Sequence, residues 1–272
     1  MLFGARKPYF SFAEKKKGGA PTDITIVTIP LLSDNYSWIL HDGTSAVVVD
    51  PGLAEPVSRF LWRAKLNLSH ILCTHHHTDH IGGVDELKHM YHSVVVGPDE
   101  PRMPFVSDRV RDEEERTILT EKMIVIATPG HTTSHMVYYF PAIRAVFTGD
   151  TLFSAGCGRM LEGTPAEMLR SLIKIAYLED LASIYCGHEY TEENLLFATT
   201  VEPDNKDVWQ RLSDVNFMHR RGIPTVPSSL TMERAINPFL RTGSPSLRKK
   251  LGMESATGIE VFAELRKRKD GF

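Results

Sequence analysis

The stretch Thr74-His75-His76-His77-Thr78-Asp79-His80 decides the fold, and it directly follows the segment Ser69–Cys73. That segment is short, ends in apolar residues and precedes polar ones, so it is predicted to be a buried strand. Four histidines and one aspartate at the carboxyl end of a buried strand are costly to keep there without compensation. Neutral imidazole and carboxylate are ligands of zinc, iron and manganese, so the sequence predicts a metal site at this position.

The spacing His-x-His-x-Asp-His within this stretch indicates how the ligands are shared between ions. Residues two apart in an extended segment point to the same side, so His75 and His77 can bind one ion. Asp79 and His80 stand at the start of the next predicted helix and can bind a second ion. His76 lies between two ligands and is expected to point away from them. A solvated surface run of histidines is the alternative, but the spacing favours metal ligation.

Three further loops offer ligands, and each begins where a predicted strand ends. In every one of them a glycine directly precedes a histidine or an aspartate. The candidates are His131 in Thr128–Thr132, Asp150 in Phe147–Thr151 and His188 in Tyr185–Glu189. The resulting five histidines and two aspartates suffice for two ions with about three protein ligands each and one bridging carboxylate.

Short β-branched segments alternate with helical ones from about residue 24 to residue 188, which predicts an α/β fold built on a sheet. Helices are expected over Glu55–Leu66 and over Thr164–Leu178, the second of which begins with a capping signal. After residue 188 the strand signal stops and helical patterns follow. We expect a basic extension over residues 1–20, a sheet domain over 21–188 and a helical domain over 189–272. The predicted strands are Ile24–Ile29, Ser45–Val49, Ser69–Cys73, Val94–Gly97, Met123–Ala127, Ala145–Phe147 and Ser183–Cys186.

Length and composition exclude several classes of protein. The chain has 272 residues, of which 42% are hydrophobic and 24% are charged, as in ordinary globular proteins. Its uncharged apolar runs are far shorter than the roughly 20 residues of a membrane-spanning helix, so we expect no membrane span. The net charge of -3 gives no electrostatic reason to expect a nucleic-acid partner.

The ends of the chain are basic, although the whole chain is slightly acidic. Residues 1–20 hold five cations against one anion, which predicts a flexible, solvated extension. An organelle-targeting segment is the alternative, although the extension has little serine and no amphipathic period. The three scattered cysteines, Cys73, Cys157 and Cys186, do not suggest a disulfide framework, so a reducing compartment, the cytoplasm, is expected.

The His-x-His-x-Asp-His signature with a downstream His, Asp and His resembles the metallo-β-lactamase superfamily, whose fold is an αββα sandwich. More narrowly, the chain is similar to the glyoxalase II family, the hydroxyacylglutathione hydrolases. The resemblance covers the chain from about residue 24 onward and implies a catalytic sandwich followed by a helical substrate-binding domain. The narrower similarity rests on Gly149–Arg159, Glu162–Thr164, Cys186–Thr191, Asn237–Arg241 and Lys269–Phe272.

This resemblance implies two divalent metal ions, with zinc expected first and iron or manganese as alternatives. Asp150 would bridge the ions together with a water-derived hydroxide, which is the implied nucleophile. Asp79 and Asp150 would thereby orient the metals and the hydroxide. The implied ligands are His75, His77 and His131 for the first ion, and Asp79, His80 and His188 for the second.

The resemblance also implies the reaction, which is hydrolysis of S-D-lactoylglutathione to D-lactate and glutathione in methylglyoxal detoxification. The partner would be this small-molecule thioester, and a monomer is expected. Family members often have lysine at the position of Arg159, and many have an aromatic residue at that of Leu161. For the basic run at residues 266–269, a solvated helix end favoured by the helix dipole is the alternative. The implied substrate contacts are Arg159, Tyr190, Arg266 and Lys269.

Three other functions compete with this one. An iron-dependent persulfide dioxygenase of the same superfamily would use a similar fold with one metal ion. A nuclease or lactamase is disfavoured by the acidic body of the chain and by the tail. A metal-stabilised binding module would bind metal without turnover. Cys157 is not expected to be a nucleophile, because no neighbouring histidine activates it.

Overall fold

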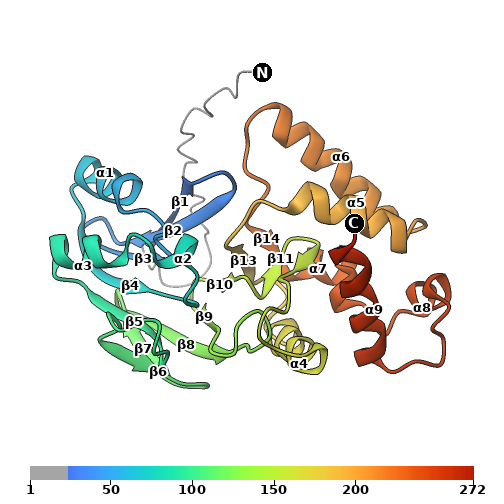
Figure 1. Ribbon diagram of the computed structural model, residues 1–272. Helices are drawn as coiled ribbons and strands as arrows, with labels where there is room; N and C mark the ends of the chain where they lie inside the picture. The colour runs from blue at the N-terminus through green and yellow to red at the C-terminus, as the bar shows by residue number, and fades with distance from the viewer. Residues whose placement is uncertain (1–23) are drawn as a thin grey trace.

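The computed structural model describes residues 24–272, and the predicted extension over residues 1–20 lies outside them. Two six-stranded sheets pack face to face in the centre, and helices cover their outer faces (Figure 1). The predicted αββα sandwich with a C-terminal helical region is confirmed. Within the described chain, no helix has both the length and the hydropathy that crossing a membrane requires.

The first sheet has the order β1-β2-β3-β4-β5-β6, and its strands from β3 to β6 run parallel. These strands are β1 (Thr25–Leu31), β2 (Asn35–His41), β3 (Ser45–Val49), β4 (Asn67–Leu72), β5 (Val94–Pro98) and β6 (Asp108–Val110).

The second sheet has the order β14-β13-β10-β9-β8-β7, and β10 and β13 are its parallel pair. A short hairpin of β11 (Leu152–Phe153) and β12 (Gly156–Cys157) follows β10. The strands of the second sheet are β7 (Glu115–Ile118), β8 (Glu121–Ala127), β9 (Met136–Phe140), β10 (Ala145–Gly149), β13 (Ser183–Cys186) and β14 (Ser228–Ser229).

The helices lie where hydrophobic spacing and capping residues place them. The predicted cap at Thr164 is present, because its side chain accepts a hydrogen bond from the Glu167 N–H and the Glu167 side chain accepts one in return. The helices are α1 (Ala54–Ala64), α2 (Thr78–Ile81), α3 (Val84–Tyr91), α4 (Pro165–Ala176), α5 (Thr191–Val201), α6 (Lys206–Arg220), α7 (Leu230–Ile236), α8 (Pro245–Leu251) and α9 (Gly258–Asp270), with a 3₁₀ turn at Pro238–Leu240.

Two long strands escaped prediction from the sequence, namely β2 and β9. Every residue of β9 is buried, and so is all of β2 except its last residue. A strand buried on both faces has no alternation of apolar and polar residues, so its period cannot be recognised. The prediction that strands stop at residue 188 is also incomplete, because β14 pairs with β13 through two residues.

Three apolar layers hold the sandwich together. Val57 and Leu61 of α1 pack with the outward-facing residues of the first sheet. The inner layer fills the space between the sheets with aromatic side chains such as Trp38 and Phe147. On the far side, Phe262 of α9 joins Leu172 of α4 and the outer face of the second sheet. The C-terminal helices therefore share a hydrophobic core with the sandwich, which fixes their position beside it.

Two buried hydrogen bonds cross between the sheets close to the predicted ligand loops. Trp38 of β2 donates through Nε1 to the carbonyl of Cys186 at 2.9 Å. Tyr138 of β9 donates through its hydroxyl to the carbonyl of Cys73 at 2.6 Å. Cys186 lies two residues before His188, and Cys73 lies two residues before His75. Each of these hydrogen bonds thus joins one sheet to a strand end of the other sheet, just before a loop that carries predicted ligands.

We predict that Tyr138→Phe lowers the free energy of unfolding by about 1–3 kcal/mol, because the buried Cys73 carbonyl loses its donor. Tyr139→Phe is the matched control, since its hydroxyl donates to the partly exposed carboxylate of Glu179 on the other face of the strand. The control should cost less than about 1 kcal/mol. Chemical denaturation of both variants measures the difference, and equal losses would contradict the role given to the cross-sheet bond.

Candidate metal centre

All seven predicted ligands meet at one edge of the sandwich. Each stands in a loop or short helix that follows the carboxyl end of a strand, where polar groups of several strands converge. The donor atoms of six of them form two triads, and within each triad the atoms lie within 4.8 Å of one another. The first triad is His75, His77 and His131, and the second is Asp79, His80 and His188.

In the first triad, imidazole nitrogens lie within hydrogen-bond distance of one another, but there are too few protons for hydrogen bonds between all of them. Nδ1 of His77 lies 3.1 Å from Nε2 of His75 and 3.0 Å from Nε2 of His131. His131 donates its Nδ1 proton to the carbonyl of Arg159 at 2.8 Å, and His75 Nδ1 lies 3.0 Å from Thr74 Oγ1. Because Nδ1 of His77 carries at most one proton, lone pairs face each other here. Such convergence fits a cation between the rings.

The second triad shows the same arrangement, with a carboxylate added. Nε2 of His80 and Nε2 of His188 lie 3.3 Å apart. The Nδ1 atom of each ring lies against a carboxylate, at 2.9 Å from Asp50 and 2.8 Å from Asp34, respectively. Asp79 Oδ2 lies 3.4 Å from His188 Nε2. In a tetrahedral site with metal–nitrogen distances of about 2.0–2.1 Å, ligand atoms lie about 3.3 Å apart, so the spacing suits a metal ion.

Asp150 lies between the two triads. Its Oδ2 is 3.5 Å from His131 Nε2 of the first triad and 3.3 Å from His188 Nε2 of the second. Its Oδ1 is 3.3 Å from His80 Nε2 and, although buried, forms no hydrogen bond with any described residue. A buried carboxylate oxygen without a donor is unfavourable unless a positive charge compensates it. The donor set therefore fits divalent metal ions.

Burial and neighbouring charges shift the pKa values of the candidate ligands. Burial lowers the pKa of His75 well below its ordinary value, and nearby imidazoles act in the same direction. Burial works against ionisation of Asp150, but His80 and His188 outweigh it and lower the pKa of this carboxyl group. Burial lowers the pKa of His188, but Asp150 and the neighbouring carboxylates outweigh it and raise this pKa to about 11. Neutral imidazole and ionised carboxylate are the forms that bind metals, so His75 and Asp150 are already in that form, whereas His188 must lose a proton to bind a metal ion.

Two glycines allow the loops to approach so closely. Gly149 has a φ of +47°, and a Cβ there would lie 2.5 Å from Thr74 Oγ1. A Cβ at Gly187 would lie 2.6 Å from Asp150 Oδ1. Real Cβ atoms do not approach so closely, so the glycine before Asp150 and the one before His188 are needed for the ligands to converge.

Several residues that orient the ligands were not predicted from the sequence. Asp50 accepts hydrogen bonds from the Thr74 N–H and the Thr74 hydroxyl, at 2.8 and 2.6 Å, and it also contacts His80. Asn35 donates to Asp79 Oδ2 at 2.8 Å. His135 stacks on His75 with ring centroids 4.9 Å apart. Asp50 follows β3, so its position at a strand end was the available signal.

The residue between the first two ligands behaves differently from them. His76 belongs to neither triad, and its Nε2 lies 3.7 Å from a carboxylate oxygen of Glu162. This placement agrees with the expectation that His76 points away from the ligand set.

The four predicted substrate contacts lie in different environments. Tyr190 stacks on the metal-ligand candidate His188, with ring centroids 4.7 Å apart and planes 7° from parallel. Arg159 is exposed near the same edge. Arg266 and Lys269 are only 4% and 8% exposed, so a solvated helix end is the wrong description of these two residues. Lys267 and Arg268 between them are exposed.

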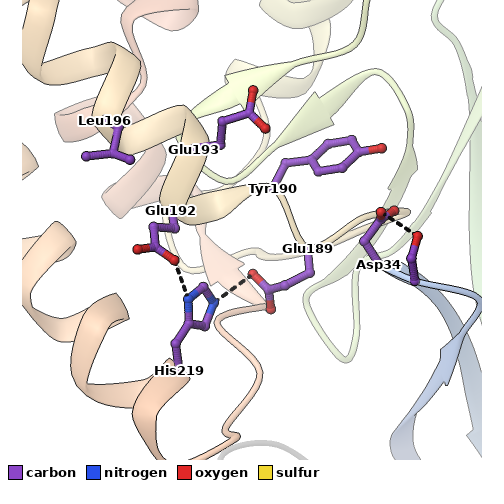
Figure 2. Close-up of a pocket in the computed structure, with 8 residues that line it drawn as sticks. Asp34, Glu189, Tyr190, Glu192, Glu193, Leu196 and His219 are labelled. Carbon is purple, nitrogen blue, oxygen red and sulfur yellow. Dashed lines mark hydrogen bonds and ion pairs between the residues drawn. The ribbon is translucent and has the colours of Figure 1, made fainter. Parts of the chain in front are cut away.

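An acidic pocket of about 290 Å³ lies beside Tyr190 (Figure 2). His219 of α6 contacts two of its carboxylates, with Nδ1 at 2.7 Å from Glu192 and Nε2 at 3.8 Å from Glu189. The pocket is lined by Ser33, Asp34, Glu189, Tyr190, Glu192, Glu193, Leu196 and His219.

Comparison with solved structures gives the same fold. A structure described as the BLEG-1 B3 metallo-β-lactamase has a TM-score of 0.61 at 24% identity, covering 79% of this chain and 99% of that one. ETHE1 from Myxococcus xanthus has a TM-score of 0.60 at 24% identity, covering 88% and 96%. At these identities the similarity establishes the fold alone.

Comparison of sequences establishes the family. Residues 32–188 match the family model of the metallo-β-lactamase superfamily, and residues 189–272 match that of the hydroxyacylglutathione hydrolase C-terminus. Hydroxyacylglutathione hydrolase of Photobacterium profundum is 45% identical over 92% of this chain and 100% of its own length. The protein of the same name from Maricaulis maris is 42% identical with the same coverage. The chain therefore belongs to the hydroxyacylglutathione hydrolase family within the metallo-β-lactamase superfamily.

Proposed function

We propose that the chain hydrolyses S-2-hydroxyacylglutathione thioesters, S-D-lactoylglutathione foremost, to a 2-hydroxy acid and glutathione. Family membership over nearly the whole length supports this substrate class. The observation that carries the chemistry is the convergence of two ligand triads on one carboxylate, Asp150. In the reaction, the water oxygen forms a bond to the thioester carbon, the carbon–sulfur bond breaks, glutathione leaves as the thiolate, and the protons of the water pass to the solvent.

We infer that two divalent ions bind, one in each triad, with Asp150 between them. Zinc is the first expectation for imidazole and carboxylate ligands, and iron and manganese are the alternatives. When bound, the ions supply activated water near neutral pH and stabilise the oxyanion that develops on the substrate carbonyl.

The protein side chains have three tasks in this proposal. The triads and Asp150 hold the ions, and Asp34 and Asp50 fix the rings of His188 and His80 from outside. Phe153 and Tyr190 pack against the ring of His188 and cover one side of the second triad. Tyr190 and Arg159 stand at the same edge and are the groups that we assign to orienting the glutathione carrier.

The alternatives are less well supported. The C-terminal helical region matches that of hydroxyacylglutathione hydrolases, which favours hydrolysis over a persulfide dioxygenase reaction. A binding module without turnover would have no need for a carboxylate shared between two ligand triads. Metal count and thioester turnover distinguish all three possibilities.

We further propose that the chain acts in the cytoplasm as a monomer. Its three cysteines are free and buried, which is consistent with a reducing compartment. Every ligand of both triads comes from a single chain. Native mass spectrometry and fractionation of cells test these two points.

We expect the purified, metal-loaded chain to hydrolyse S-D-lactoylglutathione and to contain close to two metal ions. The loss of thioester absorbance measures the rate, and elemental analysis gives the metal content. Removal of the metals with a chelator should abolish turnover, and zinc should restore it. One ion per chain together with oxygen consumption on glutathione persulfide would instead indicate the dioxygenase.

Asp150→Asn should weaken both metal sites together, because its two oxygens face both triads. Asp34→Ala is the matched comparison, since His188 is the one candidate ligand that the Asp34 side chain contacts. It should lower the affinity of the second site by about 10–100-fold and leave the first site filled. Metal titration of both variants measures this difference, and two tightly held ions in Asp150→Asn would refute the shared carboxylate.

A further inference from the structure

The two buried cations of α9 already have carboxylate partners within the chain. Lys269 donates through Nζ to Glu193 Oε1 at 2.5 Å. Arg266 donates to Asp270 Oδ1 through Nε, at 3.0 Å, and its Nη2 lies 2.9 Å from the same oxygen. A substrate carboxylate that approaches these cations therefore meets positions that protein carboxylates occupy.

The pair of Lys269 and Glu193 is asymmetric. The side chain of Lys269 is 7% exposed, and its Nζ lies 5.3 Å from the ring centroid of Phe272 and 5.9 Å from that of Phe197. The side chain of Glu193 is 64% exposed. The ammonium is thus held between aromatic rings, whereas the carboxylate can turn into solvent without breaking a buried contact.

Glu193 also lies on the way from the metal centre to Lys269. It stands three residues after Tyr190, and residues three apart at a helix start lie on neighbouring positions of one face. Tyr190 stacks on His188, and Glu193 pairs with Lys269. The start of α5 therefore connects the candidate metal centre with the end of α9. Figure 2 shows Glu192 pointing toward His219 and Glu193 pointing away from it, so the two adjacent carboxylates have different partners.

We propose that Glu193 is a specificity-determining residue that competes with a carboxylate of the thiol carrier for the ammonium of Lys269. This inference rests on the proposed function, because it assumes an anionic carrier. On binding, the carrier carboxylate takes the place of Glu193 Oε1, and the Glu193 side chain turns into solvent. The competition lowers the affinity for the anionic carrier and favours release of the product glutathione, without acting on the reacting carbon.

Glu193→Gln tests this competition, because it removes the charge and keeps the size and hydrogen-bonding capacity of the side chain. In the metal-loaded full chain, the KM for S-D-lactoylglutathione should fall about twofold to fivefold, as expected for an ion pair whose carboxylate is exposed to solvent, with kcat unchanged. The Kd of glutathione, measured by calorimetry, should fall by the same factor. Glu192→Gln is the matched control and should leave both constants unchanged, since Glu192 pairs with His219.

A thioester without a carboxylate separates competition from a structural effect. The turnover of S-D-lactoyl-N-acetylcysteamine, measured as kcat/KM, should be the same in Glu193→Gln and in the unaltered chain. An unchanged or higher KM for S-D-lactoylglutathione in the variant would overturn the proposal, as would an equal gain with the uncharged thioester. If the unaltered chain hydrolyses no glutathione thioester, the proposed function itself fails, which is a different result from a failure confined to Glu193.

Discussion

The candidate metal centre depends on a fixed relative position of the two sheets, because its ligands come from both of them. His75 follows a strand of the first sheet, whereas His131, Asp150 and His188 follow strands of the second. Metal ligation tolerates errors of only about 0.2 Å in distance, so a small slide between the sheets would disperse the donors. The hydrogen bonds of Trp38 and Tyr138 to strand ends of the opposite sheet act against that slide.

Carboxylates outside the triads couple the two ligand triads to each other. Asp50 contacts His80 of the second triad directly and reaches His75 of the first through the Thr74 hydroxyl. One buried side chain therefore orients a ring in each triad, and it acts together with Asp150 between them. Such outer carboxylates also fix the tautomer of each imidazole and raise its basicity.

The sequence was sufficient to predict which candidate ligands converge and insufficient to predict the residues that orient them. His75 was predictable because it follows a strand signal within a run of histidines. His131 was predictable because it follows another strand signal and a glycine directly precedes it. Asp50 is marked in the sequence only by its position after a strand. Its role depends on contact with the His80 ring, which arises only when the chain folds. The burial of Lys269 was likewise hidden, because four consecutive cations look solvated until the aromatic rings beside two of them are known.

The basic end of α9 contacts Glu193 of α5 and, through a second set of contacts, is linked to the candidate metal centre. Arg266 donates to the carbonyl of Cys157 at 2.9 Å, on the β11–β12 hairpin. The Asn237 amide holds the same hairpin through the carbonyl of Gly156, at 3.0 Å, which gives the Asn237–Arg241 motif a structural role. Two residues after Cys157, the carbonyl of Arg159 accepts the Nδ1 proton of His131. Movement of Arg266 would therefore reach the first triad through one short hairpin, whereas Lys269 pairs with Glu193 of α5 and not with the hairpin.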